Sequence, residues 1–236
     1  MTTEHGRRPA SPTGQEGALP PVPAEQGTRT VFPPGRQSAS PLGLSEQQGR
    51  SPLAHSEQDR RPAFGSGLRL SGHGLVLREW TDDDLPVMVE LFDDREVAYW
   101  TPLVTPFDLG AARNYLDKAR RTRAIDQRVH LAITTDGGRA KGEALLMMRD
   151  DGTGSIGYAV GAAYRGQRLA VRAVQVMTDF AHEVAGLAQV FLEIEPDNEP
   201  STRVARAAGF HLSDAPPNIV EDKGRTLSLL TWTHFR

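Results

Sequence analysis

A strand, a turn, a long helix and a second strand occupy residues 155–194, and this unit limits the folds open to the chain. Residues 155–160 form a short apolar run, and residues 167–184 carry apolar side chains at helical spacing. Residues 190–194 alternate apolar and polar side chains, as a half-buried strand does. A strand–helix–strand crossover joins parallel strands, so the sheet contains a parallel pair with a helix packed on it.

The other predicted strands follow one another more directly, which is typical of antiparallel pairing. They lie at 74–80, 129–134, 142–148 and 226–235, and Asp136-Gly137-Gly138 supplies a hairpin turn. Further helices are predicted at 85–92, 108–123 and 200–208. We therefore predict an α/β (α+β) fold: a mixed, mostly antiparallel central sheet of about six to seven strands flanked by helices. The predicted buried stripe of the long helix is Leu169, Ala173, Val174, Met177, Phe180, Ala181 and Val184.

Residues 1–65 differ in composition from the rest. They hold ten of the 17 prolines and many Gly, Ser and Gln residues, and their aromatic side chains are Phe32 and Phe64. A segment with so few large apolar side chains buries too little surface to offset the entropy of ordering it. We expect residues 1–65 to be a disordered tail and residues 66–236 to form one domain.

Several classes of protein are disfavoured by composition. The chain has no cysteine, which excludes disulfides, thiolate zinc sites and cysteine nucleophiles, and we predict no metal. No apolar run approaches the roughly 18 residues of a membrane helix, and residues 1–5 lack the apolar core of a signal peptide. The net charge of −3 gives no general attraction to nucleic acid. We expect a cytoplasmic protein without nucleic-acid or membrane partners.

The turn before the long helix reads Arg165-Gly166-Gln167-Arg168-Leu169-Ala170. The first N–H groups of a helix have no partner within it, and the helix dipole adds positive potential there. An anion such as a phosphate gains from both, and the two arginines add charge. The pattern is short, and on its own an ordinary basic turn capping a helix explains it better.

A second segment follows about thirty residues later. It reads Pro196-Asp197-Asn198-Glu199-Pro200-Ser201 and leads to Ala208-Gly209-Phe210. Asn198 suits a helix N-cap and Pro200 suits the first turn, so capping alone accounts for both residues.

Taken together, the segments resemble the GNAT superfamily of acyl-coenzyme A-dependent N-acetyltransferases. The branch they are most similar to contains the ribosomal-protein N-terminal acetyltransferases (RimJ/RimL-like). The resemblance covers about residues 70–235. It rests on Ile156–Val160, Arg165–Ala170, Asn198-x-x-Ser201 and Val204-Ala205-x-x-Ala208-Gly209-Phe210, and also on Leu75–Asp84.

The resemblance implies an acetyl-coenzyme A site. In the family, the strand equivalent to Ile156–Val160 splays from its neighbour, and the pantetheine arm bonds to its backbone, here at Tyr158, Ala159 and Val160. The resemblance also implies that Asn198 contacts the pantetheine arm and that Ser201 hydrogen-bonds the sulfur. The coenzyme A pyrophosphate is then expected at Arg165, Gly166, Gln167, Arg168, Leu169, Ala170 and Val171.

Arg168 departs from the family pattern, in which this position of the loop is usually Gly. The sequence leaves three alternatives. The side chain points away while its N–H still donates, or its guanidinium pairs with a coenzyme A phosphate, or binding is weakened and the protein is inactive.

The acceptor amine must lose a proton before it attacks, and a carboxylate could accept it. By resemblance the base is expected about twenty residues after Ser201, where Glu221 stands. Glu143, Glu193, Glu195 and His130 are alternatives, although a lone strand His is more often structural.

We therefore expect an enzyme that moves an acetyl group from acetyl-coenzyme A to a primary amine by direct attack, with Ser201 and Glu221 as its catalytic residues. The acceptor is a protein or peptide N-terminus or a small-molecule amine, and the expected assemblies include a homodimer. The alternative is a non-catalytic acyl-coenzyme A-binding module that uses the tail for interactions. A third interpretation, RNA binding through the Arg-rich loop, lacks the interleaved aromatic residues that such sites use.

Overall fold

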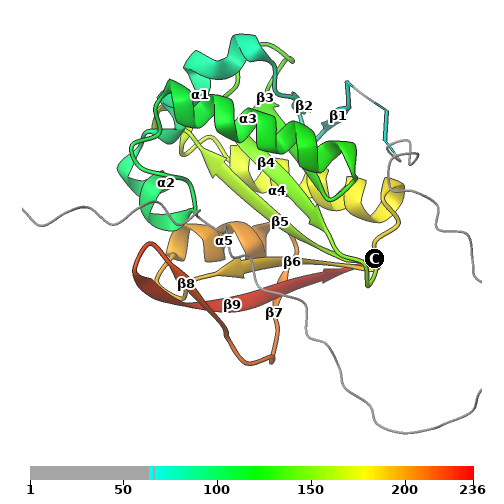
Figure 1. Ribbon diagram of the computed structural model, residues 1–236. Helices are drawn as coiled ribbons and strands as arrows, with labels where there is room; N and C mark the ends of the chain where they lie inside the picture. Colours follow the sequence, from blue (N-terminus) through cyan, green and yellow to red (C-terminus); the bar gives the residue numbers. More distant parts are fainter. Residues whose placement is uncertain (1–63, 66) are drawn as a thin grey trace, which may run out of the picture. The chain divides into compact units, whose positions relative to one another are not determined.

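The computed structural model describes residues 64–65 and 67–236. The predicted tail, apart from Phe64 and Gly65, lies outside the described residues. The described part is built on one nine-stranded sheet in the order β1-β2-β3-β4-β5-β6-β9-β7, with β8 paired to β9 (Figure 1). The strands are β1 (Arg69–Gly72), β2 (Leu75–Glu79), β3 (Arg128–Thr134), β4 (Gly142–Met148), β5 (Thr153–Val160), β6 (Gln189–Ile194), β7 (His211–Leu212), β8 (Asn218–Asp222) and β9 (Arg225–Phe235).

The helices lie close to where the sequence predicts them, with one addition. They are α1 (Leu85–Phe92), α2 (Arg95–Trp100), α3 (Leu109–Ala124), α4 (Leu169–Asp179) and α5 (Glu199–Ala207). Short 3₁₀ turns cover Asp82–Asp84 and Ala162–Tyr164, and a π-helical turn, Phe180–Val184, continues α4. The added helix is α2, which is only six residues long.

The predicted mixed, mostly antiparallel sheet is confirmed. The β5–β6 pair is parallel, and every other strand pair in the described part of the chain is antiparallel. The predicted count of six to seven strands is too low, because the patterns for β1, β7 and β8 were missed. These strands have two to five residues, too few to show a clear period.

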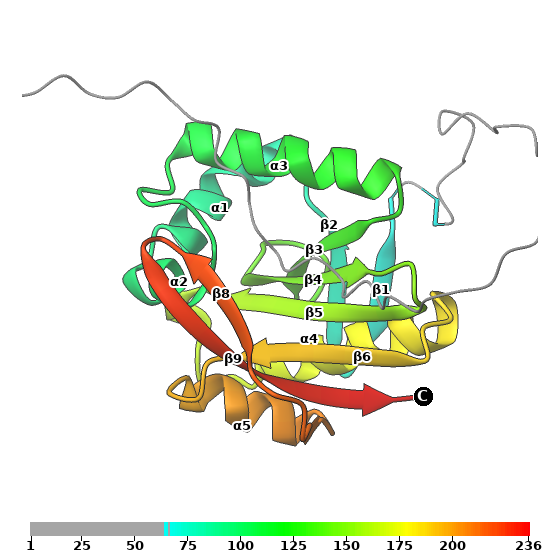
Figure 2. The same ribbon diagram turned by 60° about the horizontal axis from the view of Figure 1, so that its bottom comes forward.

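Helices cover both faces of the sheet. In Figure 2, α1 and α3 lie on one side of the sheet, and α4 and α5 lie on the other. Each side has its own apolar core. One core centres on Met88, Phe92 and Phe107 beneath α1 and α3, and the other joins Leu77 and Ile133 of the sheet to α4 and α5.

The predicted stripe of the long helix is buried from Leu169 to Ala181, but Val184 is 61% exposed. The reason lies in the π-helical turn. A π turn holds more residues than an α turn, so by its last residue, Val184, the side chain has rotated away from the stripe. The prediction of a buried Val184, which assumed a regular α-helix, is therefore wrong.

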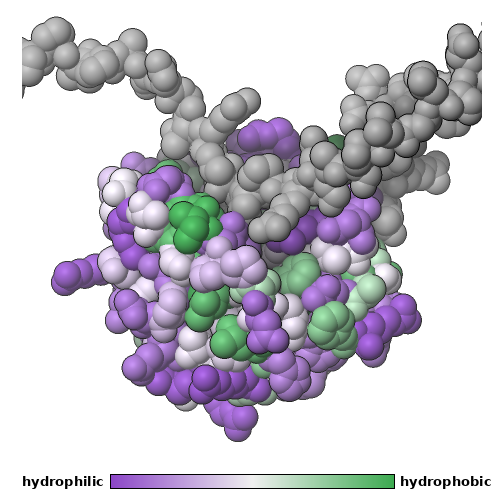
Figure 3. All heavy atoms as spheres, turned by 90° about the horizontal axis from the view of Figure 1, so that it is seen from below, coloured by the Kyte–Doolittle hydropathy of each residue, from purple (hydrophilic) through white to green (hydrophobic). Residues whose placement is uncertain are grey.

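The surface shown in Figure 3 mixes polar and apolar residues, and its hydrophobic side chains form small separate groups. No helix in the described part of the chain is long and apolar enough to cross a bilayer.

Candidate active site

Strands β5 and β6 separate after a short contact. Only Thr153, Gly154 and Ser155 of β5 pair with β6, although β5 continues to Val160 and β6 to Ile194. On its other edge β5 stays paired with β4 as far as Val160. The β6-facing edge of residues 156–160 therefore carries backbone groups without a ladder partner on β6. The splay that the resemblance implied is present.

The turn that follows β5 leaves the start of α4 open. Gly166 has φ 77° and Arg168, the N-cap residue, has φ 57° and ψ 21°. The helix begins at Leu169, two residues later than predicted, and no side chain of the described residues caps it. The N–H groups of Leu169, Ala170 and Val171 have no carbonyl partner within the helix, so this end can accept an anion.

Arg168 adopts the left-handed conformation that glycine adopts without strain. For a residue with a Cβ this conformation costs about 1 kcal/mol. The backbone of the turn thus keeps a glycine-like geometry at this position despite the substitution. The guanidinium is exposed and makes no ion pair with the described residues. This geometry is compatible with the first two alternatives for Arg168.

Arg165 is turned toward α2. Its guanidinium lies 2.7 Å from Asp94 and 2.8 Å from Glu96, and its Nε donates to the Val160 carbonyl at 3.3 Å. Asp94 is also the N-cap of α2 and accepts from the N–H groups of Glu96 and Val97. Burial acts to raise the pKa of Asp94, but the Val97 N–H and Arg165 together hold it below its ordinary value. The positive charge of Arg165 is thus balanced by carboxylates of α2.

Asn198 and Ser201 lie at the start of α5. The Asn198 Oδ1 accepts the Ser201 N–H at 3.1 Å, so Asn198 caps the helix as its residue type suggests. The Ser201 hydroxyl makes no hydrogen bond within the described part of the chain and is partly buried.

The Tyr158 side chain lies on the same face of β5 as Ile156 and Val160. Its hydroxyl is buried and has no hydrogen-bond partner among the described residues. Burial raises the pKa of Tyr158 to about 12, and the nearby Ser201 side chain acts in the opposite direction. The two hydroxyls are thus neighbours that fall short of hydrogen-bond geometry.

A family model described as "Acetyltransferase (GNAT) domain" matches residues 74–211, which include the splay, the turn and α5. The chain belongs to the GNAT acetyltransferase family. It is therefore an acetyltransferase enzyme, and members of this family use acetyl-coenzyme A.

Relatives agree with this assignment. The chain is 25% identical over 165 residues to "Uncharacterized N-acetyltransferase p20" of Bacillus licheniformis, covering 66% of this chain and 89% of the relative. The structure of a putative ribosomal-protein-serine acetyltransferase from Vibrio cholerae aligns with TM-score 0.63 at 18% identity, covering 75% of this chain and 100% of that one. Mycobacterium smegmatis RimJ, solved with CoA-disulfide, aligns with TM-score 0.63 at 18% identity over 75% and 90% of the two chains.

Glu221 is exposed on β8 in this acetyltransferase, where it accepts a hydrogen bond from the Thr226 hydroxyl at 2.5 Å. Successive side chains of a strand point to opposite faces. Asn218, three residues earlier, donates to Glu193 of β6 at 3.0 Å. Glu221 therefore lies on the opposite face of β8 from Asn218 and Glu193.

Glu193 and Glu195 follow the last β6 residue that pairs with β5. Leu192 and Ile194 are buried toward α4 and α5, so the two glutamates face the other side of the sheet. Glu195 forms an ion pair with Arg225 at 2.8 Å. The splayed end of β6 therefore presents two partly buried carboxylates.

Glu143 is buried and fully engaged. It accepts hydrogen bonds from Trp80 at 2.9 Å and Tyr115 at 2.5 Å, and His130 Nδ1 lies 3.3 Å away. Burial, and then the charge of Glu143, raise the pKa of Tyr115 well above its ordinary value. This network holds Glu143 and the Nδ1 side of His130 within the core.

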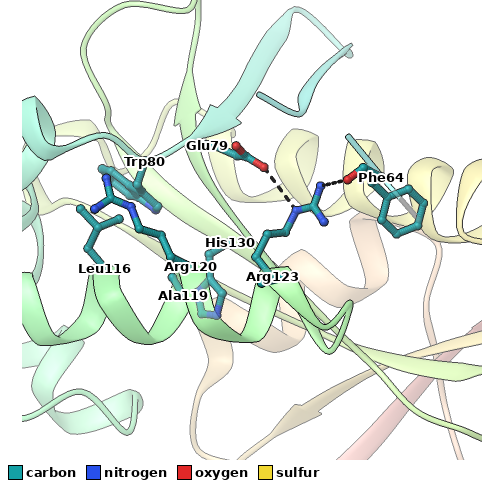
Figure 4. A pocket seen from close by; sticks show the side chains of 9 residues that line it. Phe64, Glu79, Trp80, Leu116, Ala119, Arg120, Arg123 and His130 are labelled. Carbon is teal, nitrogen blue, oxygen red and sulfur yellow. Dashed lines mark hydrogen bonds and ion pairs between the residues drawn. The ribbon is translucent and has the colours of Figure 1, made fainter. Parts of the chain in front are cut away.

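The cavity of about 270 Å³ shown in Figure 4 lies away from the splay, between α3 and the ends of β2 and β3. Arg123 crosses its rim, bonding Glu79 at 3.2 Å and the Phe64 carbonyl at 2.7 Å. Of the residues proposed from sequence, the cavity lining contains only the alternative base His130. In the described residues no group of three or more His, Asp or Glu side chains is placed to bind a metal.

The sequence reasoning missed α2 and its contacts. Lys223 donates to the carbonyls of Ala98 and Thr101 at 2.6 and 2.8 Å, and Arg225 donates to that of Tyr99 at 3.0 Å. The turn between β8 and β9 thus holds the C-terminal end of α2, while Arg165 holds its N-terminal end. An Asp before Arg-Glu is an N-cap signal that could have indicated the helix.

Proposed function

We propose that this acetyltransferase moves the acetyl group of acetyl-coenzyme A to a primary amine, either a peptide N-terminus or a small-molecule amine, by direct attack. The observation that carries the proposal is the splay between β5 and β6, which lies between the open N-terminus of α4 and the start of α5. The absence of cysteine is consistent with transfer that has no covalent enzyme intermediate.

The donor is proposed to bind along the free edge of β5. Its pantetheine amides would pair with the backbone of Tyr158, Ala159 and Val160, and Asn198 has its Nδ2 group left to donate. The pyrophosphate is proposed to accept from the N–H groups of residues 166–171. Arg165 would contribute through its backbone, because its guanidinium is engaged with α2.

The chemical contribution of β5 is a fixed N–H donor beside the thioester carbonyl. Negative charge develops on that oxygen as the amine attacks, and one well-placed donor is worth roughly 3–4 kcal/mol. Ser201 is proposed to hydrogen-bond the leaving sulfur. A serine hydroxyl is a weak acid, so it would stabilise the thiolate by position and would not supply a proton outright.

Two carboxylates are candidates for the base that accepts the amine proton. Glu221 is the residue predicted from sequence, and Glu193 lies on the splayed end of β6, where the neighbouring Glu195 is ion-paired with Arg225. A base must come within hydrogen-bond reach of the amine, directly or through one water.

The test is free-thiol release from acetyl-coenzyme A with a panel of peptides and small amines. The proposal is supported if the rate of thiol release depends on the amine and is lower in a Ser201→Ala variant than in the wild type. Binding of acetyl-coenzyme A by calorimetry without turnover on any amine favours instead the non-catalytic binding module. Three further predictions are the division into a tail of 1–65 and a domain of 66–236, a cytoplasmic location and a homodimer. Comparing the activity of full length with that of 66–236 tests the division, and comparing their masses in solution tests the homodimer.

A further inference from the structure

We propose that the Tyr158 side chain is a positioning residue for sulfur departure, acting by donating a hydrogen bond to the Ser201 hydroxyl. This inference rests on the proposed function. It assigns the side chain of Tyr158 a task separate from the backbone contacts expected of that residue.

The position of Tyr158 supports this. Its Cα partner is Ala144 on β4, and it has no partner on β6, so it belongs to the splayed part of β5. Its side chain packs on the core formed with α4 and α5, which includes Val204 and Ala205 of the helix that carries Ser201 in its first turn. The residue therefore connects the edge of the proposed donor site with the first turn of α5.

The hydrogen bonding of the two groups is incomplete. The Tyr158 hydroxyl is buried without a partner, and the Ser201 hydroxyl has none within the described residues. Buried polar groups in proteins are nearly always paired, because an unpaired one loses its hydration without compensation. One hydrogen bond between the two hydroxyls would satisfy both groups.

The direction of that bond determines its effect. A serine hydroxyl has one proton and two acceptor lone pairs. When Tyr158 donates to the Ser201 oxygen, the serine proton is left to point at a third group, and hydrogen bonds in a chain strengthen one another. With its pKa raised to about 12, Tyr158 remains a protonated donor throughout the neutral range.

The reaction balances without a proton from Tyr158. The amine nitrogen forms the new C–N bond, the C–S bond breaks, and its electron pair leaves on sulfur. The ammonium proton goes to the base, and the Ser201 hydroxyl donates a hydrogen bond to the thiolate. Tyr158 only fixes the direction of that donation.

The test compares Tyr158→Phe, Ser201→Ala and the double variant, with Tyr164→Phe as the matched control. Tyr164 also lies close to the turn, but its hydroxyl contacts Arg139 instead. We expect Tyr158→Phe to lower kcat about tenfold with little change in the KM for acetyl-coenzyme A. In the Ser201→Ala background the same change should have no further effect, since its partner is gone.

A second measurement needs no acceptor. The pKa of the coenzyme A thiol bound to the enzyme, followed by ultraviolet absorbance, should rise in Tyr158→Phe and stay unchanged in Tyr164→Phe. The Tm of Tyr158→Phe should equal or exceed that of the wild type, because an unpaired hydroxyl is removed. A wild-type kcat and bound-thiol pKa in Tyr158→Phe, or additive losses in the double variant, would overturn the inference. Failure of the wild type to bind coenzyme A would overturn the proposed function and this inference with it.

Discussion

The guanidinium of Arg165 lies 2.7 Å from the carboxylate of Asp94, so the turn before α4 is ion-paired to the N-terminus of α2. The opposite end of α2 is held by Lys223 and Arg225. α2 is thereby tied to two segments of the chain, one on each side of the splay. A change at either end of α2 is expected to affect the turn.

Asp94→Ala should destabilise the protein by about 1–2 kcal/mol, because it removes both the α2 cap and the Arg165 ion pair. Asp94→Asn keeps a capping oxygen and should cost less. The control is Asp108→Ala, which removes the cap of α3, because Asp108 is paired with no arginine in the described part of the chain. Urea denaturation measures all three. Equal losses in Asp94→Asn and Asp94→Ala would contradict the capping contribution.

Arg168→Gly should stabilise the fold by about 1 kcal/mol, because glycine adopts a positive φ without strain. Arg168→Ala keeps the strained position and removes the guanidinium. Calorimetry with acetyl-coenzyme A separates the alternatives. Equal affinity in all three proteins assigns the contact to the backbone, and a loss in both variants assigns it to the guanidinium. A large gain in Arg168→Gly means that the arginine weakens binding.

Glu193→Gln should lower kcat about tenfold or more near neutral pH, since Glu193 lies on the splayed end of β6. Glu221→Gln should have a smaller effect because its carboxylate is exposed on the far face of β8. The pH–rate profiles of both variants measure this with a saturating amine. The reverse order would assign the base to Glu221, and no loss in either would leave water as the proton acceptor.

Stability should fall as the pH drops below about 6.5, through His234, whose Nδ1 lies 3.0 Å from His182 Nε2. Burial, followed by the charges of His182 and His211, lowers the pKa of His234 from its ordinary value. The unfolded chain therefore binds a proton at higher pH than the folded chain does, and stability is lost between the ordinary pKa and the lower folded one. In His234→Gln, denaturation midpoints at neutral and mildly acidic pH should differ less than in the wild type.

Phe64→Ala should destabilise the domain by about 1–3 kcal/mol. The Phe64 ring packs on Phe180 with centroids 5.0 Å apart, and the Arg123 guanidinium lies 5.7 Å above it. A chain that begins at residue 66 lacks this ring and the carbonyls of Phe64 and Gly65, both of which accept hydrogen bonds from Arg123. Its Tm should therefore be lower than that of a chain beginning at residue 64. Identical melting curves would show that Phe64 contributes nothing to the domain.

The features predicted correctly from sequence are those that depend on a local pattern of neighbouring residues. The strand at 155–160, the helix stripe up to Ala181 and the Asn198 cap each depend on neighbours within a few positions. The pairing of Arg165 with Asp94 joins residues 71 positions apart, and no local pattern marks it. The same holds for the approach of Tyr158 to Ser201, which depends on how α5 packs beside the sheet.

Short helices and strands were also missed by the sequence-based prediction. A helix of six residues such as α2 and a strand of two residues such as β7 show less than two repeats of their period. Asp93 and Asp94 both have local hydrogen-bonding roles near the start of α2. Asp94 does cap α2, and Asp93 accepts the Phe107 N–H at 3.1 Å.

The three residue pairs that join β5 to β6 have a consequence for the chain as a whole. The sheet has two halves, β1–β5 and β6–β9, and the backbone ladder that joins them contains only the pairs made by residues 153–155. A ligand lying along the free edge of β5 would act as an extra strand and complete the interrupted ladder. Amide hydrogens of residues 156–160 that face the gap should then exchange more slowly with solvent once the donor binds, which makes the coenzyme a part of the sheet's cohesion as well as a reactant.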